Sequence, residues 1–526
     1  MNARPHPAGP AARAGATPST PDAAEVVAAE VVAAVAGRLA DPETVRRIAT
    51  APGNLDSYQG LAPRPPWEPQ SLIEGFPGVA LLHAELGRTD PGARVRAHAH
   101  LAAAGAQPWS SQRPTGLYGG PAALAFAARA AAHGPSDYAT LLTGLDQVVL
   151  TRTQALLAGT HALLDRTRAL PGGTQALPGD GAEGPGPAAT GVQPVTPVPP
   201  VPPVPSEAVP HEVAPYEVLG GLSGLGRYLL ACLPDHRAAL EGTLRCLVRL
   251  SEPVRVHGAD LPGWWAAAGP ADRPAGHRQA GFRGHVGLGM AHGVAGPLAL
   301  LALAGLHGVR VPGTQQAAER MAEWLLAWRE EDGTGTFWPS TVTLNEQLTG
   351  RLDHRPRPRA GWCHGSAGIA RALHLAGRAF GRPAWSQAAL EAHTAALLRA
   401  LGAQPMDNSG LCHGWAGLLR TTQLLIRDTA TPARHGRPDI QSDSRPDSYL
   451  DVLADAVVRR FRPETPFGYA LRAPGEAHLA ADRAGFLEGA AGTALALHAY
   501  IRRSDDARHT VGTRPATGWD AALLID

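Results

Sequence analysis

Apolar residues recur along this chain in short helical runs, and each run follows a small glycine turn. The clearest copies read HGSAGIARALHLAG, with the first glycine at Gly365, and EGAAGTALALHAY, with the first glycine at Gly489. Seven such turns occur, 44 to 102 residues apart, and the widest spacing contains a proline-rich stretch. A unit that returns at this interval is typical of a repeat architecture. The first glycines of the seven turns are Gly75, Gly119, Gly221, Gly293, Gly365, Gly414 and Gly489.

Each interval between turns has room for a second helix, and one interval shows its period plainly. Five apolar residues there lie at i, i+4, i+7, i+8 and i+11, which is one face of a helix, and Gly333 can end that helix. These residues are Ala317, Met321, Trp324, Leu325 and Trp328. Helical hairpins that cannot bury their apolar faces alone stack side by side. We therefore expect an all-α fold, a double-layered α/α toroid of about seven hairpins with the glycine turns at one end; periodicity alone also allows an open solenoid.

Two segments lack this pattern: one precedes the predicted domain and the other interrupts it. Residues 1–22 are rich in Ala and Pro, and about 171–210 contain the run VPPVPPVP. Such composition favours extended conformations without a packed core. The sequence predicts a disordered N-terminus, 1–22, followed by a single toroid domain, 23–526, that is interrupted by the insert at about 171–210. The insert is interpreted as a tether, with a proline-rich docking motif as the alternative.

Charge and cysteine content restrict the function and the compartment. The 526 residues carry 47 basic and 46 acidic side chains, a net charge of +1, which argues against nucleic acid and against a polybasic membrane contact. Four cysteines cannot make a disulfide framework in so long a chain, and Cys232 and Cys246 lie within apolar helical stretches as expected core thiols. The most apolar run, Pro297 to Leu306, is shorter than the ~20 residues of a membrane span. A cytoplasmic protein without a transmembrane segment is expected.

Candidate chemistry is concentrated in three of the seven turns. A histidine precedes the glycine in MAHG (His292), WCHG (Cys363 and His364) and LCHG (Cys412 and His413). If the turns meet at one end of a ring, Cys363, Cys412 and His413 become neighbours, and two thiolates with one imidazole are good zinc ligands. Three protein ligands leave a fourth position for water or substrate, which is typical of a catalytic zinc, whereas His364 as a fourth ligand would close the site.

These turns resemble the lanthionine synthetase C-like family, the cyclases of lantibiotic biosynthesis. The resemblance extends from about Ser71 to Tyr500 and is most specific in the Trp-Cys-x-Gly and Cys-His-Gly turns. In the family these two turns supply three zinc ligands. The resemblance therefore implies one Zn²⁺ per chain, bound by Cys363, Cys412 and His413.

Other site residues are also implied by this resemblance. His292 matches the family's catalytic histidine in an Ala-His-Gly turn, and Arg359 matches an arginine four residues before the first zinc cysteine. Glu217, in Tyr-Glu-Val, stands where the family commonly has Asp, so it keeps the carboxylate with one more methylene. His364 stands where many bacterial members have tyrosine, and it is an additional acid or base, a ligand, or a tolerated substitution.

The implied activity is zinc-dependent formation of (methyl)lanthionine thioether rings. A cysteine thiolate of the peptide adds to the β-carbon of dehydroalanine or dehydrobutyrine, and an enolate results. His292 is expected to protonate the α-carbon, Arg359 to stabilise the enolate oxygen and Glu217 to orient His292. The expected substrate is a dehydrated precursor peptide with its leader, and a dehydratase and an export transporter are the partners that the family leads one to expect.

Two other functions remain open at the level of sequence. An α/α-toroid glycoside hydrolase needs paired carboxylates across the bowl, for which Glu74, Glu217 and Glu488 in the turns are candidates. A zinc-containing relative that binds thiols or peptides without cyclising them is the non-enzymatic alternative. Zinc content separates the hydrolase from the other two functions, and an activity assay separates the cyclase from the binding protein.

Overall fold

The chain is described by a computed structural model that covers most of the sequence. The described residues are 23–56, 63–108, 116–169, 215–256, 259–266, 284–353, 357–430, 446–473, 476–503 and 517–526. The predicted disordered N-terminus, 1–22, and the predicted insert, about 171–210, both lie outside these residues.

Two layers of helices alternate along the chain. Seven helices begin at the glycine turns and form the inner layer: α3 (Phe76–Leu86), α5 (Gly120–Ala131), α7 (Leu222–Ala231), α9 (Ala295–Leu306), α12 (Ser366–Phe380), α14 (Trp415–Ala430) and α16 (Ala490–Ile501). Seven more form the outer layer: α1 (Ala23–Arg38), α4 (Pro91–Gly105), α6 (Ala139–Ala169), α8 (Arg237–Leu250), α10 (Thr314–Ala327), α13 (Pro383–Leu401) and α15 (Pro446–Val458). Two short helices, α2 (Pro42–Ala49) and α11 (Leu344–Thr349), lie outside this alternation.

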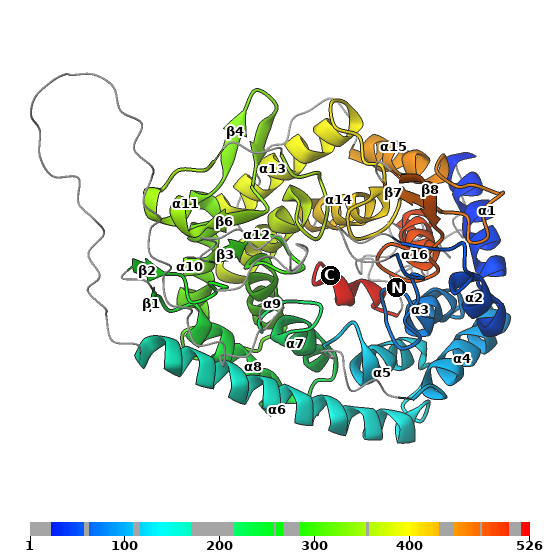
Figure 1. Cartoon of the computed structure of the whole chain (residues 1–526), viewed down its shortest axis with the longest axis horizontal. Coiled ribbons are helices and arrows are strands. Elements are labelled where there is room, and N and C mark those ends of the chain that lie inside the picture. Colours follow the sequence, from blue (N-terminus) through cyan, green and yellow to red (C-terminus); the bar gives the residue numbers. More distant parts are fainter. Residues whose placement is uncertain are drawn as a thin grey trace, which may run out of the picture.

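The inner helices close into a ring. Each contacts the next in chain order, and α16 contacts α3, so the last repeat meets the first. Each of the first six inner helices also packs against the outer helix that follows it, and α1 supplies the outer partner of α16. Figure 1 shows the two layers around a central C-terminal segment. The predicted α/α toroid of seven hairpins is confirmed, and the open solenoid is ruled out.

Backbone hydrogen bonds join the seven turns into a second closed circuit at one end of the ring. The bonds run between consecutive turns, with N···O distances of 2.9 to 3.3 Å, and the last turn returns to the first. They are Leu72 to Tyr118, Tyr118 to Leu219, Val218 to Ala291, Ala291 to Cys363, Trp362 to Cys412, Cys412 to Leu487 and Phe486 to Leu72, with the N–H donor first. The residues just before each glycine are therefore held side by side around this end of the ring.

The second glycine of the turns is required by this close approach. A Cβ atom placed on it would lie 1.7 to 2.8 Å from a backbone carbonyl oxygen of its own turn in six of the seven repeats. At Gly368 and Gly492 these distances are 2.0 and 1.7 Å. Real Cβ atoms do not come so near to an oxygen, so the Gly-x-x-Gly spacing is a packing requirement of the turn.

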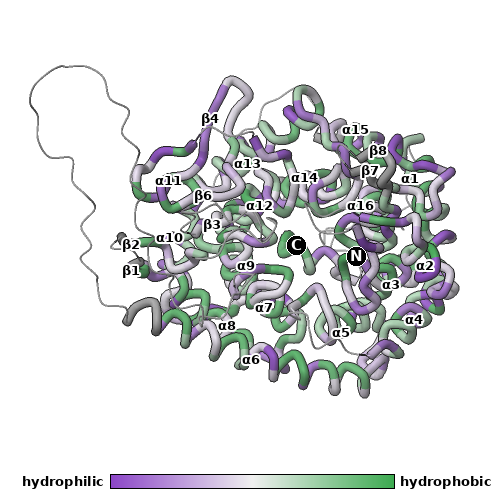
Figure 2. The backbone as a smooth tube through the Cα atoms, in the orientation of Figure 1, coloured by the Kyte–Doolittle hydropathy of each residue, from purple (hydrophilic) through white to green (hydrophobic). Residues whose placement is uncertain are grey.

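Residues 517–526 fill the centre of the ring. A 3₁₀ helix, η2 (Trp519–Leu523), is buried there together with the three residues that follow it. Arg420 of α14 pairs with Asp520 at 2.6 Å, and the Trp362 indole N–H donates to the Leu523 carbonyl at 2.8 Å. In Figure 2 this segment and much of α9 are coloured as hydrophobic. The helices therefore surround a packed core, and the turn that carries Cys363 rests on it.

Short strands occur between the helices and were not predicted from the sequence. They make four two-stranded antiparallel sheets: β1 (Val254–Val256) with β2 (Ala259–Leu261), β3 (His285–Gly287) with β6 (Thr341–Thr343), β4 (Glu330–Asp332) with β5 (Gly335–Phe337), and β7 (Leu471–Ala473) with β8 (Glu476–Ala481). The predicted helix around Met321 is α10, but it ends at Ala327, and Gly333 lies in the β4–β5 hairpin instead. None of the helices described is long and apolar enough to cross a membrane.

Candidate metal centre and catalytic site

The closed circuit of turns brings Cys363, Cys412 and His413 together. Their ligand atoms, two Sγ and one imidazole nitrogen, all lie within 4.8 Å of one another. The Cys363 backbone N–H donates to the Cys412 carbonyl at 3.1 Å, which fixes the two turns in register. Cys363 is buried, and Cys412 and His413 are half-buried. Residues 49 positions apart thus form one cluster at the turn end of the ring.

The two thiols of this cluster share one environment and titrate as a pair. A hydrogen bond from the Cys412 thiol, with a further contribution from His413, holds the pKa of Cys363 well below its usual range. The same hydrogen bond and burial raise the pKa of Cys412 well above its usual range. Cys363 is therefore the thiol of the pair that ionises first, and a proton remains between the two sulfurs.

The donor set of this cluster fits zinc. Two sulfurs and one imidazole nitrogen are ligands that Zn²⁺ prefers, and a cation placed between them would take over the charge that the shared proton now balances. His364, the residue between Cys363 and the turn glycine, is not a member of the group of neighbouring ligand atoms. Three protein ligands are the number found in catalytic zinc sites.

The next turn around the ring carries a histidine that contacts a buried carboxylate. Nδ1 of His292 contacts Oε2 of Glu217, and the other oxygen of Glu217 accepts the Gly220 N–H at 2.5 Å. The Glu217 side chain is 2% exposed and that of His292 is 38% exposed. The longer carboxylate at position 217 thus still reaches the histidine. This arrangement fixes the imidazole at Nδ1 while the ring remains accessible from the open end of the toroid.

His364 and Arg359 lie beside these groups in different ways. The His364 ring stacks on the His292 ring, with centroids 5.5 Å apart and planes inclined by 24°. The Arg359 guanidinium pairs with Asp407 at 2.7 Å, and both side chains are largely exposed. The structure therefore brings His364 to His292, and it places Arg359 on the rim, against the loop that leads to the Cys412 turn.

Two partners of His413, and a third residue that binds one of them, were not identified from the sequence. Glu488 contacts Nδ1 of His413 at 3.2 Å, and Asn408 contacts Nε2 at 3.0 Å. Arg483 pairs with Glu488 from the other side. The repeat pattern could have pointed to Glu488. It directly precedes its turn glycine, as His413 does in the preceding repeat. Asn408 and Arg483 stand outside the repeated turn pattern and carry no such signal.

A second cluster of ligand-type residues does not fit a divalent cation. It consists of Asp146, Cys232 and His236, between α6, α7 and α8. The Arg129 guanidinium contacts one oxygen of Asp146 and the Tyr228 hydroxyl contacts the other, so the carboxylate is already engaged by a cation. Burial raises the pKa of Cys232 to about 12, so this thiol stays protonated. Cys232 is a core thiol, as predicted, and Cys246 is likewise buried.

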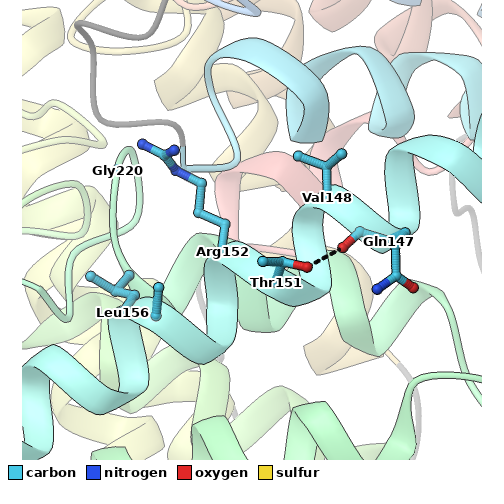
Figure 3. A pocket seen from close by; sticks show the side chains of 7 residues that line it. Gln147, Val148, Thr151, Arg152, Leu156 and Gly220 are labelled. Carbon is cyan, nitrogen blue, oxygen red and sulfur yellow. Dashed lines mark hydrogen bonds between the residues drawn. The ribbon is translucent and has the colours of Figure 1, made fainter.

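A pocket of about 530 Å³ opens between the long outer helix α6 and the turn before α7. Figure 3 shows the side chains that line it, which come from consecutive turns of α6 and include the Arg152 guanidinium. Its lining residues are Gln147, Val148, Thr151, Arg152, Ala155, Leu156 and Gly220. Gly220 is the residue whose N–H binds Glu217. The pocket thus adjoins the backbone of the turn that carries Glu217 and is lined by none of the residues predicted from the sequence to act in the site.

Comparison with known proteins agrees with this architecture. The model of the family described as lanthionine synthetase C-like protein matches residues 66–511. Among solved structures, nisin cyclase is similar over 95% of this chain and 98% of its own, with a TM-score of 0.62 and 17% sequence identity, a likeness that supports the fold. None of the curated proteins matches the chain in sequence. Since the family match spans most of the chain, this protein belongs to the lanthionine synthetase C-like family.

Proposed function

We propose that this protein is a zinc-dependent lanthipeptide cyclase. The observation that carries the proposal is the meeting of Cys363, Cys412 and His413 at one end of the ring, one turn away from the His292–Glu217 pair. Family membership and the fold shared with nisin cyclase support a cyclase role. The substrate is a dehydrated precursor peptide with its leader, and the product contains (methyl)lanthionine rings.

The metal would be held by the three ligands of the cluster. Zinc bound there would supply a positive charge that favours the thiolate form of a cysteine from the peptide at neutral pH. The low pKa of Cys363 and its buried position suit it for a permanent metal ligand. The exposed edge of His413 and the half-buried Cys412 leave the centre accessible from the rim.

Side chains of the protein then transfer the proton that the addition step requires. The peptide thiolate forms a C–S bond to the β-carbon of dehydroalanine or dehydrobutyrine, and the electrons of the C=C bond move to an enolate. His292, protonated and held at Nδ1 by Glu217, delivers a proton to the α-carbon, and the proton lost by the peptide thiol replaces it, so the thioether forms without any other reactant. His364, stacked on His292, confines the ring to this position.

Arg359 is assigned to the enolate oxygen or to the acidic groups of the peptide. Its guanidinium lies on the rim, 48% exposed, with Asp407 as its partner. An exposed cation can exchange this partner for a substrate oxygen at small energetic cost, because exposed ion pairs contribute only about 0 to 1 kcal/mol. A dehydratase and an export transporter are the partners that fit a peptide of this kind, and the reduced thiols suit the cytoplasm.

The glycoside hydrolase alternative is not favoured by the turn carboxylates. Glu217 contacts His292, Glu488 pairs with Arg483, and Glu74 pairs with Arg64 at 3.7 Å. A hydrolase needs one carboxyl group that is protonated and one that faces the sugar. Each of these three carboxylates already contacts a basic side chain, which leaves them poorly placed to serve as the acid and base of a hydrolase.

The test is ring formation in a synthetic peptide that contains one dehydroalanine and one cysteine. Cyclisation leaves the mass unchanged, so it is followed by the loss of thiols that react with N-ethylmaleimide. The zinc-loaded wild type should consume the thiol, and Cys412→Ala should lose both zinc and activity. His292→Ala should keep its zinc and lose ring closure. Cys246→Ala, a buried thiol outside the centre, is the matched control. Thiol loss that continues without metal would refute the mechanism, and zinc binding without thiol loss would indicate the binding protein.

A further inference from the structure

The seventh turn of the ring places a carboxylate against the histidine of the metal centre. Oε1 of Glu488 lies 3.2 Å from Nδ1 of His413, and the Glu488 side chain is only 11% exposed. The approach depends on Gly410, since a Cβ at that position would lie 2.7 Å from the Glu488 Cα. The Leu487 carbonyl also accepts the Cys412 N–H at 2.9 Å, so the two turns are fixed to each other on both sides of the contact.

The opposite nitrogen of the His413 ring identifies the tautomer. Nδ2 of Asn408 lies 3.0 Å from Nε2 of His413, and Oδ1 of Asn408 accepts the Gly410 N–H at 2.7 Å. Because the Gly410 N–H requires an acceptor, the Asn408 amide can present only its NH₂ group to His413. Nε2 must then carry the lone pair, so the ring proton sits on Nδ1, which faces the Glu488 carboxylate at 3.2 Å. A metal bound at Nε2 would displace the Asn408 NH₂ group and leave Nδ1 facing Glu488.

A second contact fixes the Glu488 carboxylate on the side away from His413. Its other oxygen contacts the Arg483 guanidinium, which is 5% exposed and also pairs with Asp56 at 2.5 Å. This buried pairing limits the rotation of the carboxylate. The chain from Asp56 through Arg483 and Glu488 to His413 thus mirrors the contact of Glu217 with His292 two turns away.

We propose that Glu488 is a positioning residue of the metal centre, which fixes the tautomer and the orientation of His413. The proposal rests on the proposed zinc site and adds the residue that prepares one of its ligands. A carboxylate that accepts the distal N–H of a ligating histidine raises the basicity of the ligand and holds the ring in place, and loss of such a partner typically lowers metal affinity by about 10- to 100-fold.

Glu488→Gln tests this role with zinc affinity as the readout, measured by competition with a chromophoric chelator. The amide keeps the shape of the side chain but accepts the Nδ1 proton more weakly, so zinc should bind about 10- to 100-fold more weakly than to wild type. Glu74→Gln is the matched control, because Glu74 holds the same position in the neighbouring turn and pairs with Arg64. Its zinc affinity should equal that of wild type.

A double-mutant cycle separates positioning from general structural damage. In the background His413→Cys, which keeps a metal ligand but removes the imidazole, the change Glu488→Gln should alter zinc affinity by less than about twofold, because the group on which Glu488 acts is gone. If Glu488→Gln unfolds the protein, Glu488→Asp keeps the charge for Arg483, withdraws the oxygen from His413 and should weaken zinc binding as well.

Two results would overturn the proposal: one refutes the positioning role alone, and the other refutes the zinc site as well. Wild-type zinc affinity in Glu488→Gln, or an equal loss with and without His413, refutes positioning while the zinc site stands. A wild-type protein that binds no zinc at Cys412 and His413 refutes the proposed function together with this inference.

Discussion

The contact between Glu217 and His292 offers the sharpest test of the proton-transfer step. Replacing Glu217 by Gln keeps the volume and leaves an oxygen for the Gly220 N–H, which the native side chain accepts at 2.5 Å. The amide NH₂ group then faces Nδ1 of His292. Because an NH₂ group donates, the imidazole must carry its proton on Nε2 and cannot be stabilised as imidazolium by a neighbouring negative charge.

The expected fall in kcat for Glu217→Gln is estimated from the burial of the Glu217 side chain. A hydrogen bond to a charged group contributes about 1.5 to 3 kcal/mol. The Glu217 side chain is 2% exposed, so water cannot replace the lost charge, and the upper part of that range, about 2 to 3 kcal/mol, applies. Since about 1.4 kcal/mol corresponds to a factor of ten, kcat for cyclisation should fall by roughly 30- to 150-fold.

The assay is the rate of thiol loss from the dehydroalanine peptide, measured beside zinc content. Glu217→Gln should retain the zinc of wild type, because position 217 lies outside the ligand cluster. Glu217→Asp restores the charge with a shorter reach and should recover part of the rate. A Glu217→Gln rate within about threefold of wild type would show that the carboxylate does not act through His292.

Three further predictions concern stability. Gly368→Ala should lower the free energy of unfolding by several kcal/mol, because its Cβ would meet a carbonyl oxygen at 2.0 Å; an unchanged melting temperature contradicts the packing argument. Arg420→Ala leaves Asp520 buried without its cation and should cost about 3 to 5 kcal/mol in chemical denaturation, whereas a loss under 1 kcal/mol would mean the central segment is loosely packed. Burial lowers the pKa of His83 to about 3 and of His100 to about 4, so the unfolded chain binds more protons below about pH 6.5. Stability should therefore be full above about pH 6.5 and fall toward pH 4, by at most about 1.4 kcal/mol per pH unit for each histidine, and a constant melting temperature from pH 7 to 5 would contradict this.

Much of the fold could be predicted because the repeated glycine turns show where each inner helix begins. The turn glycines mark every inner helix, and the close approach at Gly368 and Gly492 explains why they recur. The short strands could not be predicted, since pairs of three-residue strands such as those around Gly333 leave no alternating pattern. The central position of residues 517–526 was also missed, because it depends on the width of the ring and not on any local periodicity.

Part of the candidate site could likewise be predicted from the sequence, and part could not. Cys363, Cys412 and His413 were identified together because the repeats predicted a ring, with an open solenoid as the alternative, and the residues occupy equivalent turn positions. Their roles as ligands stay predictions. The contact of Glu488 with His413 depends on two side-chain orientations and on the Asn408 amide, and the sequence specifies neither. The sequence indicated Glu488 only as a candidate carboxylate of a glycoside hydrolase.

The most direct test of the account is the zinc content of the purified protein, measured by elemental analysis for wild type, Cys363→Ala and Cys246→Ala. We predict about one zinc per chain in wild type and in Cys246→Ala, and none in Cys363→Ala. Wild-type protein without zinc, or zinc that persists in Cys363→Ala, would contradict the claim that the turns of Cys363, Cys412 and His413 form a metal centre.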